Sequence, residues 1–184
     1  MALEREIKLR FDTADEARAR VLELGVTPFK GRRLQEDCLL DDERQSLRKR
    51  ECVLRVRNEG GKGLLTFKGA GQPGPMKLRE EHETVVADGE TLLTILAEVG
   101  LRVWFRYEKY REEFHFADVI IAVDETPLGT FIEIEGGESH IHQVARELGR
   151  APSDYITDSY HALFLKHREA IGIEGNDMVF AAQL

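Results

Sequence analysis

The chain has 184 residues, a length that suits one domain with a sizeable core, and a formal net charge of −8. Its composition, 42% hydrophobic and 33% charged residues, is that of an ordinary globular protein. The acidic balance argues against a general binder of nucleic acid or of anionic membranes. We therefore expect neither a nucleic-acid polymer nor a membrane among its partners.

The sequence lacks the usual marks of secretion and of a zinc site. No long apolar run is present, and the first residues carry no signal-peptide core. Cys38 and Cys52 are too few and too isolated for a disulfide framework or a zinc site. His140 and His142 diverge on a helix, so we expect structural or surface roles for them. We predict a cytoplasmic protein with reduced thiols.

The first predicted strand, residues 3–9, carries its charges on one face. Because strand side chains alternate between faces, Glu4, Glu6 and Lys8 lie together and Ile7 and Leu9 lie opposite. A single strand of this kind is explained by a sheet with one solvated face. The same alternation recurs along the chain, and this recurrence asks for another explanation.

Helices are predicted where capping residues precede apolar side chains at helical spacing. A Thr-x-x-Glu capping box at Thr13 begins a helix over 13–24. Asp88 and Ser139 are predicted to cap two more helices, each of which ends before a glycine. A last helix is predicted over 159–170, with an apolar face that packs on the sheet.

Strands separate these helices. The highly charged segment 41–50 is predicted as a loop or short helix, and the segment 69–75, rich in glycine and proline, as a flexible loop. The further strands are predicted over 34–40, 52–57, 64–68, 77–83, 103–116, 119–124 and 131–135.

Alternation gathers acids and bases on the same face of these strands. The acids are Glu4, Glu6, Glu81, Glu83, Asp124, Glu133 and Glu135. The bases are Lys8, Arg55, Arg57, Lys68, Arg79, Lys109 and Arg111. The opposite faces are mostly apolar and suit a cover of helices. The pattern predicts an α+β fold in which an antiparallel sheet closes into a tunnel with its charged face inward.

Such a tunnel is tolerable only if water, cations and an anionic ligand fill it, because unpaired buried ions are costly. Carboxylates bind a hard divalent cation, and arginine and lysine grip phosphate oxygens. The combination suits a metal–polyphosphate complex. For Arg79 and Glu83, an ordinary surface ion pair is an equally good interpretation. Trp104 is expected to be a core residue, with contact to a substrate's organic group as the alternative.

The ordered motifs of the chain resemble those of the CYTH, or triphosphate tunnel metalloenzyme, superfamily. The resemblance rests on Glu4-x-Glu6-x-Lys8, Gln35-x-Asp37-x-x-x-Asp41, Leu54-Arg55-Val56-Arg57, Leu65-Thr66-Phe67-Lys68-Gly69, Arg79-x-Glu81-x-Glu83, Glu108-Lys109-x-Arg111, Asp124-x-x-x-x-Gly129-x-Phe131-x-Glu133-x-Glu135 and Asp158-Ser159-Tyr160. It implies a closed eight-stranded antiparallel β-barrel with helices outside. We expect a single domain of this type over 1–184, with 172–184 as a tail that frays.

The resemblance also implies a function and a set of site residues. A divalent metal, Mg²⁺ or Mn²⁺, is expected on Glu4, Glu6, Glu81, Asp124, Glu133 and Glu135. The phosphates of the substrate are expected on Lys8, Arg55, Arg57, Lys68, Arg79, Lys109 and Arg111. The catalytic set is predicted as Glu4, Glu6, Lys8, Arg55, Arg57, Lys68, Arg111, Glu133 and Glu135.

We predict a metal-dependent triphosphatase acting on inorganic tripolyphosphate, a nucleoside triphosphate or thiamine triphosphate, as a monomer or homodimer. One alternative is a class IV adenylyl cyclase that converts ATP to cyclic AMP and pyrophosphate. Cyclase-type members tend to carry a His-Phe pair shortly before the first motif, and none precedes Glu4, which favours hydrolysis. A non-catalytic polyphosphate-binding module is the second alternative, which the many carboxylates argue against.

Overall fold

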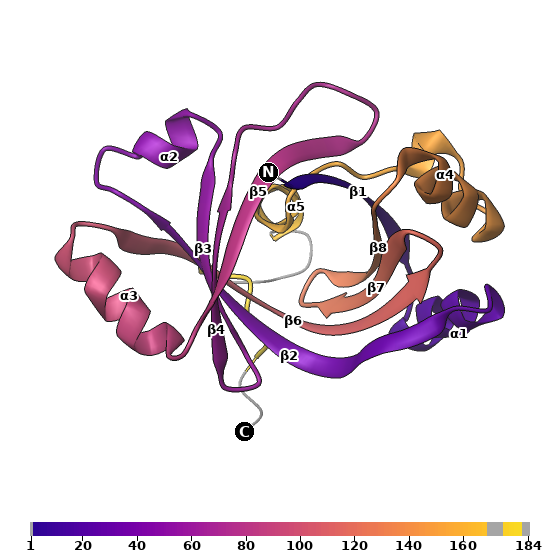
Figure 1. Cartoon of the computed structure of the whole chain (residues 1–184), viewed down its shortest axis with the longest axis horizontal. Helices are drawn as coiled ribbons and strands as arrows, with labels where there is room; N and C mark the ends of the chain where they lie inside the picture. The colour runs from indigo at the N-terminus through magenta and orange to yellow at the C-terminus, as the bar shows by residue number, and fades with distance from the viewer. Residues whose placement is uncertain (1, 169–174, 182–184) are drawn as a thin grey trace.

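Eight strands form one closed antiparallel barrel in the order β1-β5-β4-β3-β2-β6-β7-β8 (Figure 1). The structure is a computed structural model that describes residues 2–168 and 175–181. The strands are β1 (Ala2–Phe11), β2 (Thr27–Asp41), β3 (Val53–Glu59), β4 (Lys62–Lys68), β5 (Lys77–Val86), β6 (Arg102–Phe116), β7 (Val119–Thr126) and β8 (Gly129–Glu135). The predicted fold class, an eight-stranded α+β barrel with outer helices, is confirmed.

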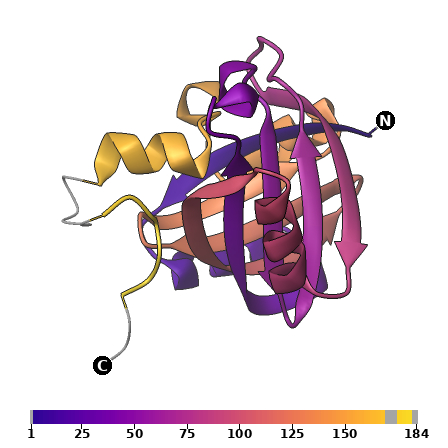
Figure 2. The same ribbon diagram turned by 90° about the vertical axis from the view of Figure 1, so that its left-hand side faces the viewer.

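Most helices lie outside the barrel wall, on opposite sides of it, and the last one lies over one end of the barrel (Figure 1 and Figure 2). They are α1 (Ala14–Glu23), α2 (Ser46–Lys49), α3 (Gly89–Glu98), α4 (Glu138–Glu147), the 3₁₀ turn η1 (Pro152–Asp154) and α5 (Tyr160–His167). Helices α1 and α4 contact β1, β7 and β8, whereas α2 and α3 contact β2, β3 and β4. None of these helices, within the part of the chain that the structure describes, has the length and apolar character needed to cross a membrane.

The larger core lies between the barrel wall and the helices α1 and α4. Ile7 and Leu9 point outward from β1 and are fully buried, together with Val21 of α1 and with Ile141 and Val144 of α4. Complete burial of each such side chain stabilises the fold by about 1.5–3 kcal/mol. The alternation along β1 therefore places its apolar side chains under helices, which leaves Glu4, Glu6 and Lys8 to the interior of the barrel.

A second core covers the first half of β6, where the strand has a neighbour on one side only. Strand β7 begins to pair with β6 at Tyr110, so the edge before that residue is open to another partner. Met178 takes this place through a parallel bridge to Tyr107, with the Glu108 N–H donating to its carbonyl at 2.9 Å. Phe164 of α5 packs in the same cluster, and Figure 2 shows α5 and the segment 175–181 on one side of the barrel.

Residues 175–181 therefore depart from the expectation of a frayed tail over 172–184. Met178 is fully buried, the Phe180 ring lies 5.3 Å from that of Tyr110, and the Asp177 carboxylate accepts the Arg106 N–H at 2.7 Å. The rest of that prediction, 172–174 and 182–184, lies outside the described residues. Unpaired donors and acceptors on β6 explain why this segment is held, because a strand edge is a template for an added chain.

Most predicted elements are present with boundaries shifted by a few residues. The helix over 13–24 is confirmed, and the Thr13 side chain accepts the Glu16 N–H at 3.2 Å. The strand predicted over 34–40 is too short, since β2 begins at Thr27 and its polar first half pairs with the end of β6. Residues 169 and 170, the predicted end of the last helix, lie outside the described residues.

The predicted cap of α4 is wrong. The helix begins at Glu138 after Gly137, and Ser139 is already in its first turn. The preceding turn packs against the β6–β7 hairpin so closely that a Cβ on Gly136 would lie 2.6 Å from the Asp118 carbonyl oxygen. Gly136 also has a φ of 145°, a backbone conformation that residues other than glycine rarely adopt. This close approach, rather than a serine cap, determines where the helix starts.

Candidate functional site

The barrel encloses one large charged cavity of about 1340 Å³. Every charge predicted to face inward lines it, apart from Asp124: Glu4, Glu6, Lys8, Arg55, Arg57, Lys68, Arg79, Glu81, Glu83, Lys109, Arg111, Glu133 and Glu135. The period of two in the sequence thus corresponds to the inner surface of the barrel, because each strand sends alternate side chains inward.

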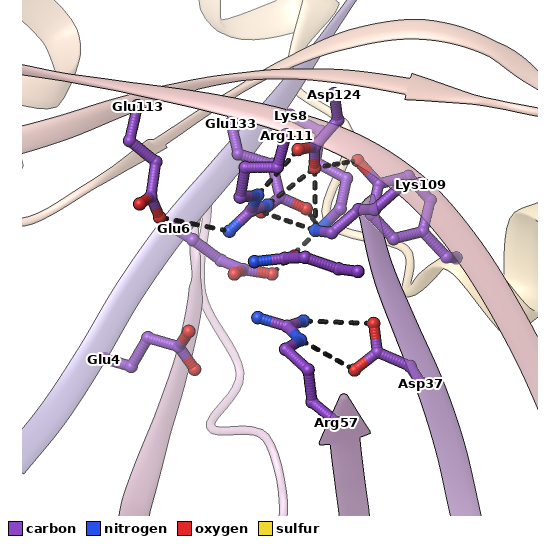
Figure 3. A network of polar contacts seen from close by, with 12 residues as sticks. Glu4, Glu6, Lys8, Asp37, Arg57, Lys109, Arg111, Glu113, Asp124 and Glu133 are labelled. Atoms are coloured by element: carbon purple, nitrogen blue, oxygen red, sulfur yellow. Dashed lines mark hydrogen bonds and ion pairs between the residues drawn. The ribbon is translucent and has the colours of Figure 1, made fainter. Parts of the chain in front are cut away.

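One side of the cavity is a network in which bases and acids neutralise each other (Figure 3). The Lys8 ammonium lies 2.8 Å from Glu6 and 3.3 Å from Glu133. Arg111 donates from Nε and Nη2 to Asp124, both at 2.6 Å, and also contacts Glu133. Burial alone would lower the pKa of the Lys8 ammonium, but Glu133 and Glu6 outweigh it and hold the pKa above its ordinary value. These bases remain charged at neutral pH and are available to phosphate.

Asp124 lies behind this network instead of on the cavity surface. It is fully buried and accepts hydrogen bonds from Lys109 at 2.8 Å, from Arg111 and from the Tyr160 hydroxyl at 2.7 Å. Strand register places it directly opposite Arg111 on the neighbouring strand. With its oxygens accepting from these donors, Asp124 orients Lys109 and Arg111, and its role as a metal ligand stays a prediction.

A second paired group joins β2 and β3. The Arg57 guanidinium donates to Asp37 at 2.9 and 3.2 Å, and Arg55 lies 3.4 Å from the same carboxylate. Arg55 also donates to Thr66 at 3.1 Å, and Thr66 donates in turn to Glu83 at 2.8 Å. Asp37 is 1% exposed, so it serves as a buried counter-ion that fixes both arginines at the cavity wall.

Next to this network, on β1, β5 and β8, lie the carboxylates Glu4, Glu81 and Glu135. Lys68 is shared between Glu4, at 2.6 Å, and Glu81, at 3.0 Å. The Glu135 carboxylate makes no hydrogen bond or ion pair with any residue in the described part of the chain, although its backbone pairs with β1 and β7. Burial, opposed by Lys68 and reinforced by Glu6 and Glu81, raises the pKa of Glu4 to about 8. Burial likewise raises the pKa of Glu135 to about 7, because Lys68 offsets it only in part.

This excess of carboxylates fits a divalent cation. Glutamate oxygens are the ligands that Mg²⁺ and Mn²⁺ prefer, and a nearby cation would favour the charged form of Glu4 and Glu135. No three acidic, histidine or cysteine side chains within residues 2–168 and 175–181 already form a closed metal cage. The carboxylates point to lysines instead, so a cation would require Glu4 or Glu81 to turn from Lys68.

Three side chains that contact these charges were not predicted as site residues. Asp37 pairs with the arginines, the Tyr160 hydroxyl binds Asp124, and Lys77 contacts Glu6. Lys77 alternates with Arg79 and Glu81 along β5, so its periodicity was a usable signal. Asp37 and Tyr160 lie in motifs that carry the family resemblance, but their roles depend on partners far along the chain.

The remaining predicted residues lie at the rim of the same cavity. Arg79 lines it beside Gly71 of the 69–76 loop, and a Cβ on that glycine would lie 3.5 Å from the Arg79 Nε. Trp104 packs against the second core, as expected, and also lines the cavity, so its contact with a substrate's organic group stays a prediction. His140 and His142 lie elsewhere, where they contact Asp118 at 2.5 Å and the Tyr155 hydroxyl at 2.9 Å.

Comparisons with known proteins agree with this architecture. A protein of Methanocaldococcus jannaschii that carries the provisional name of adenylate cyclase is 29% identical over 142 residues, which are 77% of this chain and 81% of that protein. A solved structure from Pyrococcus horikoshii is 27% identical, with a TM-score of 0.75 over 90% of this chain and 99% of that one.

A solved structure from Hippeastrum is 19% identical, with a TM-score of 0.66 over 90% of this chain and 96% of that one. That protein carries the provisional name of adenylyl cyclase, and its structure is reported with a dominant triphosphatase activity. At this identity the likeness concerns the fold alone. The CYTH domain family model matches residues 2–160. That match spans the whole barrel and reaches the first residue of α5, so this chain belongs to the CYTH domain family.

Proposed function

We propose that this protein is a divalent-metal-dependent phosphohydrolase that acts on a triphosphate bound inside the barrel. The observation that carries the proposal is the presence of both kinds of charge in one cavity. Bases from six strands line it together with a group of carboxylates, of which Glu4 and Glu81 share Lys68. A bare anion would not need the carboxylates, and a bare cation would not need the arginines.

The acid-rich side would hold the cation. Glu4, Glu81 and Glu135 supply its oxygens, with Glu6 and Glu133 at the border of the basic side. When bound, Mg²⁺ or Mn²⁺ would neutralise phosphate charge and lower the pKa of a water molecule. The residues of this chain bind and orient the phosphates, so positioning and charge compensation provide most of the expected rate enhancement.

The basic side would hold the phosphate chain. Lys8, Arg55, Arg57, Lys109 and Arg111 lie along it, each already oriented by a carboxylate. Substrate phosphates would take over some of these carboxylate contacts, so little side-chain ordering is needed on binding. Arginine suits this role because its planar group donates two parallel hydrogen bonds to phosphate oxygens.

Adenylyl cyclase activity is the second candidate, supported by the name of the 29% identical relative. The same metal and basic side chains would serve, and the nucleophile would be the ribose 3′-hydroxyl of ATP instead of water. The Hippeastrum neighbour illustrates that a barrel of this kind can carry triphosphatase activity under a cyclase name.

Product analysis separates the candidates. The protein is incubated with tripolyphosphate, ATP or thiamine triphosphate, with Mg²⁺ or Mn²⁺, and the products are identified by chromatography. Orthophosphate release from a triphosphate supports hydrolysis, whereas cyclic AMP with pyrophosphate supports the cyclase. Binding without any product would instead support a non-catalytic polyphosphate-binding module. Glu4→Gln protein, purified in the same way, controls for contaminating phosphatases.

A further inference from the structure

One end of the charged cavity has a different chemistry from the rest. Its lining there includes Arg48, Val53, Trp104 and His161, which we call the aromatic mouth, with Glu51 and Asp158 close by along the chain. The ring of Trp104 lies edge-on to that of His161, with centroids 4.7 Å apart and an interplanar angle of 87°. The Arg48 guanidinium carbon lies 4.3 Å from the centre of the Trp104 ring. An arginine held over an indole is a planar platform on which a further ring can stack.

Arg48 is fixed in this position from behind. Its Nε donates to the Asp41 carboxylate at 3.1 Å, and Asp41 is 2% exposed. The Leu47 and Arg48 N–H groups donate to the same carboxylate, at 3.0 and 3.1 Å, which ties the short helix α2 to the barrel. The Arg48 side chain is nevertheless 37% exposed, so part of the guanidinium is open to a ligand.

The aromatic mouth adjoins the predicted phosphate-binding side. Val53 stands opposite Lys68 on the neighbouring strand, and Arg55 follows two residues later on the same face as Val53. Leu39, also on the cavity surface, stands opposite both Arg55 and Phe105. Two residues along a strand span about 7 Å. A flat group attached through a sugar to a phosphate on Arg55 or Lys68 would therefore come within reach of Arg48 and Trp104.

We infer that the aromatic mouth binds the base of a nucleoside triphosphate whose phosphates occupy the charged cavity. This inference rests on the proposed function and narrows its substrate class from any triphosphate to one that carries an uncharged planar ring. Thiamine triphosphate carries a cationic ring, which the Arg48 charge repels. Burial, and secondarily Arg48, lower the pKa of His161, so this histidine is neutral at pH 7 and can exchange hydrogen bonds with a base edge.

Fluorescence gives a binding readout that does not depend on turnover, because Trp104 is the only tryptophan of the chain. The protein is titrated, with Mg²⁺, with the β,γ-imido analogue of ATP and with diimidotriphosphate, which lacks a base. Stacking predicts a marked change in Trp104 emission with the nucleotide and a small one with the inorganic analogue. Equal changes with both analogues would overturn the inference.

Kinetics with two variants supply the second test. Trp104→Leu removes the platform, and Arg48→Lys keeps the charge but removes the planar group. Each is expected to raise the KM for ATP about tenfold, as the loss of one stacked base does. The KM for tripolyphosphate should stay within about twofold. Phe29→Leu is the matched control, since this ring is 46% exposed and lies outside the cavity lining.

The outcomes separate the inference from the function on which it rests. Turnover of tripolyphosphate with an unchanged KM for ATP in both variants would overturn the aromatic mouth and leave the triphosphatase in place. Equal losses for ATP and tripolyphosphate would also overturn it, because the residues would then only support the barrel. Preference for thiamine triphosphate would contradict the charge argument. If the protein neither turns over nor binds any triphosphate, the proposed function itself is refuted.

Discussion

Two groups of buried charges in the tunnel differ in how they are neutralised. The paired wall neutralises itself: Lys8, Arg57, Lys109 and Arg111 each contact a carboxylate among Asp37, Asp124 and Glu133. The acidic wall, made of Glu4, Glu81 and Glu135, has one shared base in Lys68. The paired wall is therefore organised before any ligand arrives, whereas the acidic wall, under the proposed function, would be completed by a cation.

This difference has an energetic basis. Buried ion pairs cost desolvation energy that their attraction repays only when the geometry is good and the remaining donors are satisfied. Asp124 meets this condition with Lys109, Arg111 and the Tyr160 hydroxyl. Glu135 does not meet this condition, and burial without a paired base raises its pKa to about 7. Substitutions on the two walls should therefore have different consequences for stability and for turnover.

The largest effect is expected on the paired wall. Arg57→Ala leaves Asp37 buried without its best partner, so the free energy of unfolding should fall by about 3–5 kcal/mol, as when one member of a buried pair is removed. Turnover should fall as well, by one or more powers of ten, through the lost phosphate contact. Urea denaturation and steady-state kinetics measure the two losses separately.

The double variant Arg57→Ala/Asp37→Ala sharpens this test. Removing both charges should restore much of the stability, because no uncompensated carboxylate remains, but it should not restore turnover. A single variant that loses stability yet keeps its kinetics would place Arg57 outside the phosphate-binding set. Recovery of turnover in the double variant would contradict the account in the same way.

The acidic wall should show the reverse pattern. Glu4→Gln removes a metal oxygen, and turnover should fall by about two powers of ten, comparable to the loss of one strong electrostatic contact in an active site. Stability should hold or rise, since one of several crowded carboxylates is removed. Glu80→Gln, an exposed residue on the outer face of β5, is the control and should change neither property. Near-full activity of Glu4→Gln at low Mg²⁺ would refute the metal assignment.

A smaller effect concerns pH. The pKa of Glu135 is raised in the folded state, so the folded protein binds more protons than the unfolded chain between about pH 4.5 and 7. Its contribution to stability is complete below the ordinary glutamate pKa and is lost as the pH rises through about 7. Without divalent cations, the melting temperature of Glu135→Gln should consequently fall less across this window than that of the natural chain. Parallel curves for the two proteins would contradict the raised pKa.

Periodicity was enough to predict the inner surface of the barrel. Glu4, Glu6 and Lys8 alternate with buried apolar residues, and this local pattern determines which face of β1 meets the helices. Capping residues such as Thr13 and Asp88 acted in the same local way. The resemblance to a known family added the number of strands in the closed sheet, eight, which no local pattern specifies.

Contacts between segments far apart in the chain could not be predicted from the sequence. Asp37 orients Arg57 only because β2 and β3 lie in one register, and Tyr160 reaches Asp124 only because α5 covers the open edge of β6. The sequence pattern placed Asp124 with the cavity acids, although its partners on β6 turn it into a buried support. The polar start of β2, from Thr27, was missed because tertiary pairing overrides its weak strand pattern.

The central claim is that the paired wall and the acidic wall bind one ligand together, a metal–triphosphate complex. Mg²⁺ alone leaves the bases without phosphate, and triphosphate alone faces the carboxylates. A complex that binds the folded state only should add roughly 2.7 kcal/mol at a hundredfold excess over Kd. Thermal melts with Mg²⁺, with tripolyphosphate, with both, and with Mg²⁺ and orthophosphate measure this directly. The account predicts that both together raise the melting temperature by more than the sum of the separate shifts. Additive shifts, or equal shifts with orthophosphate, would contradict it.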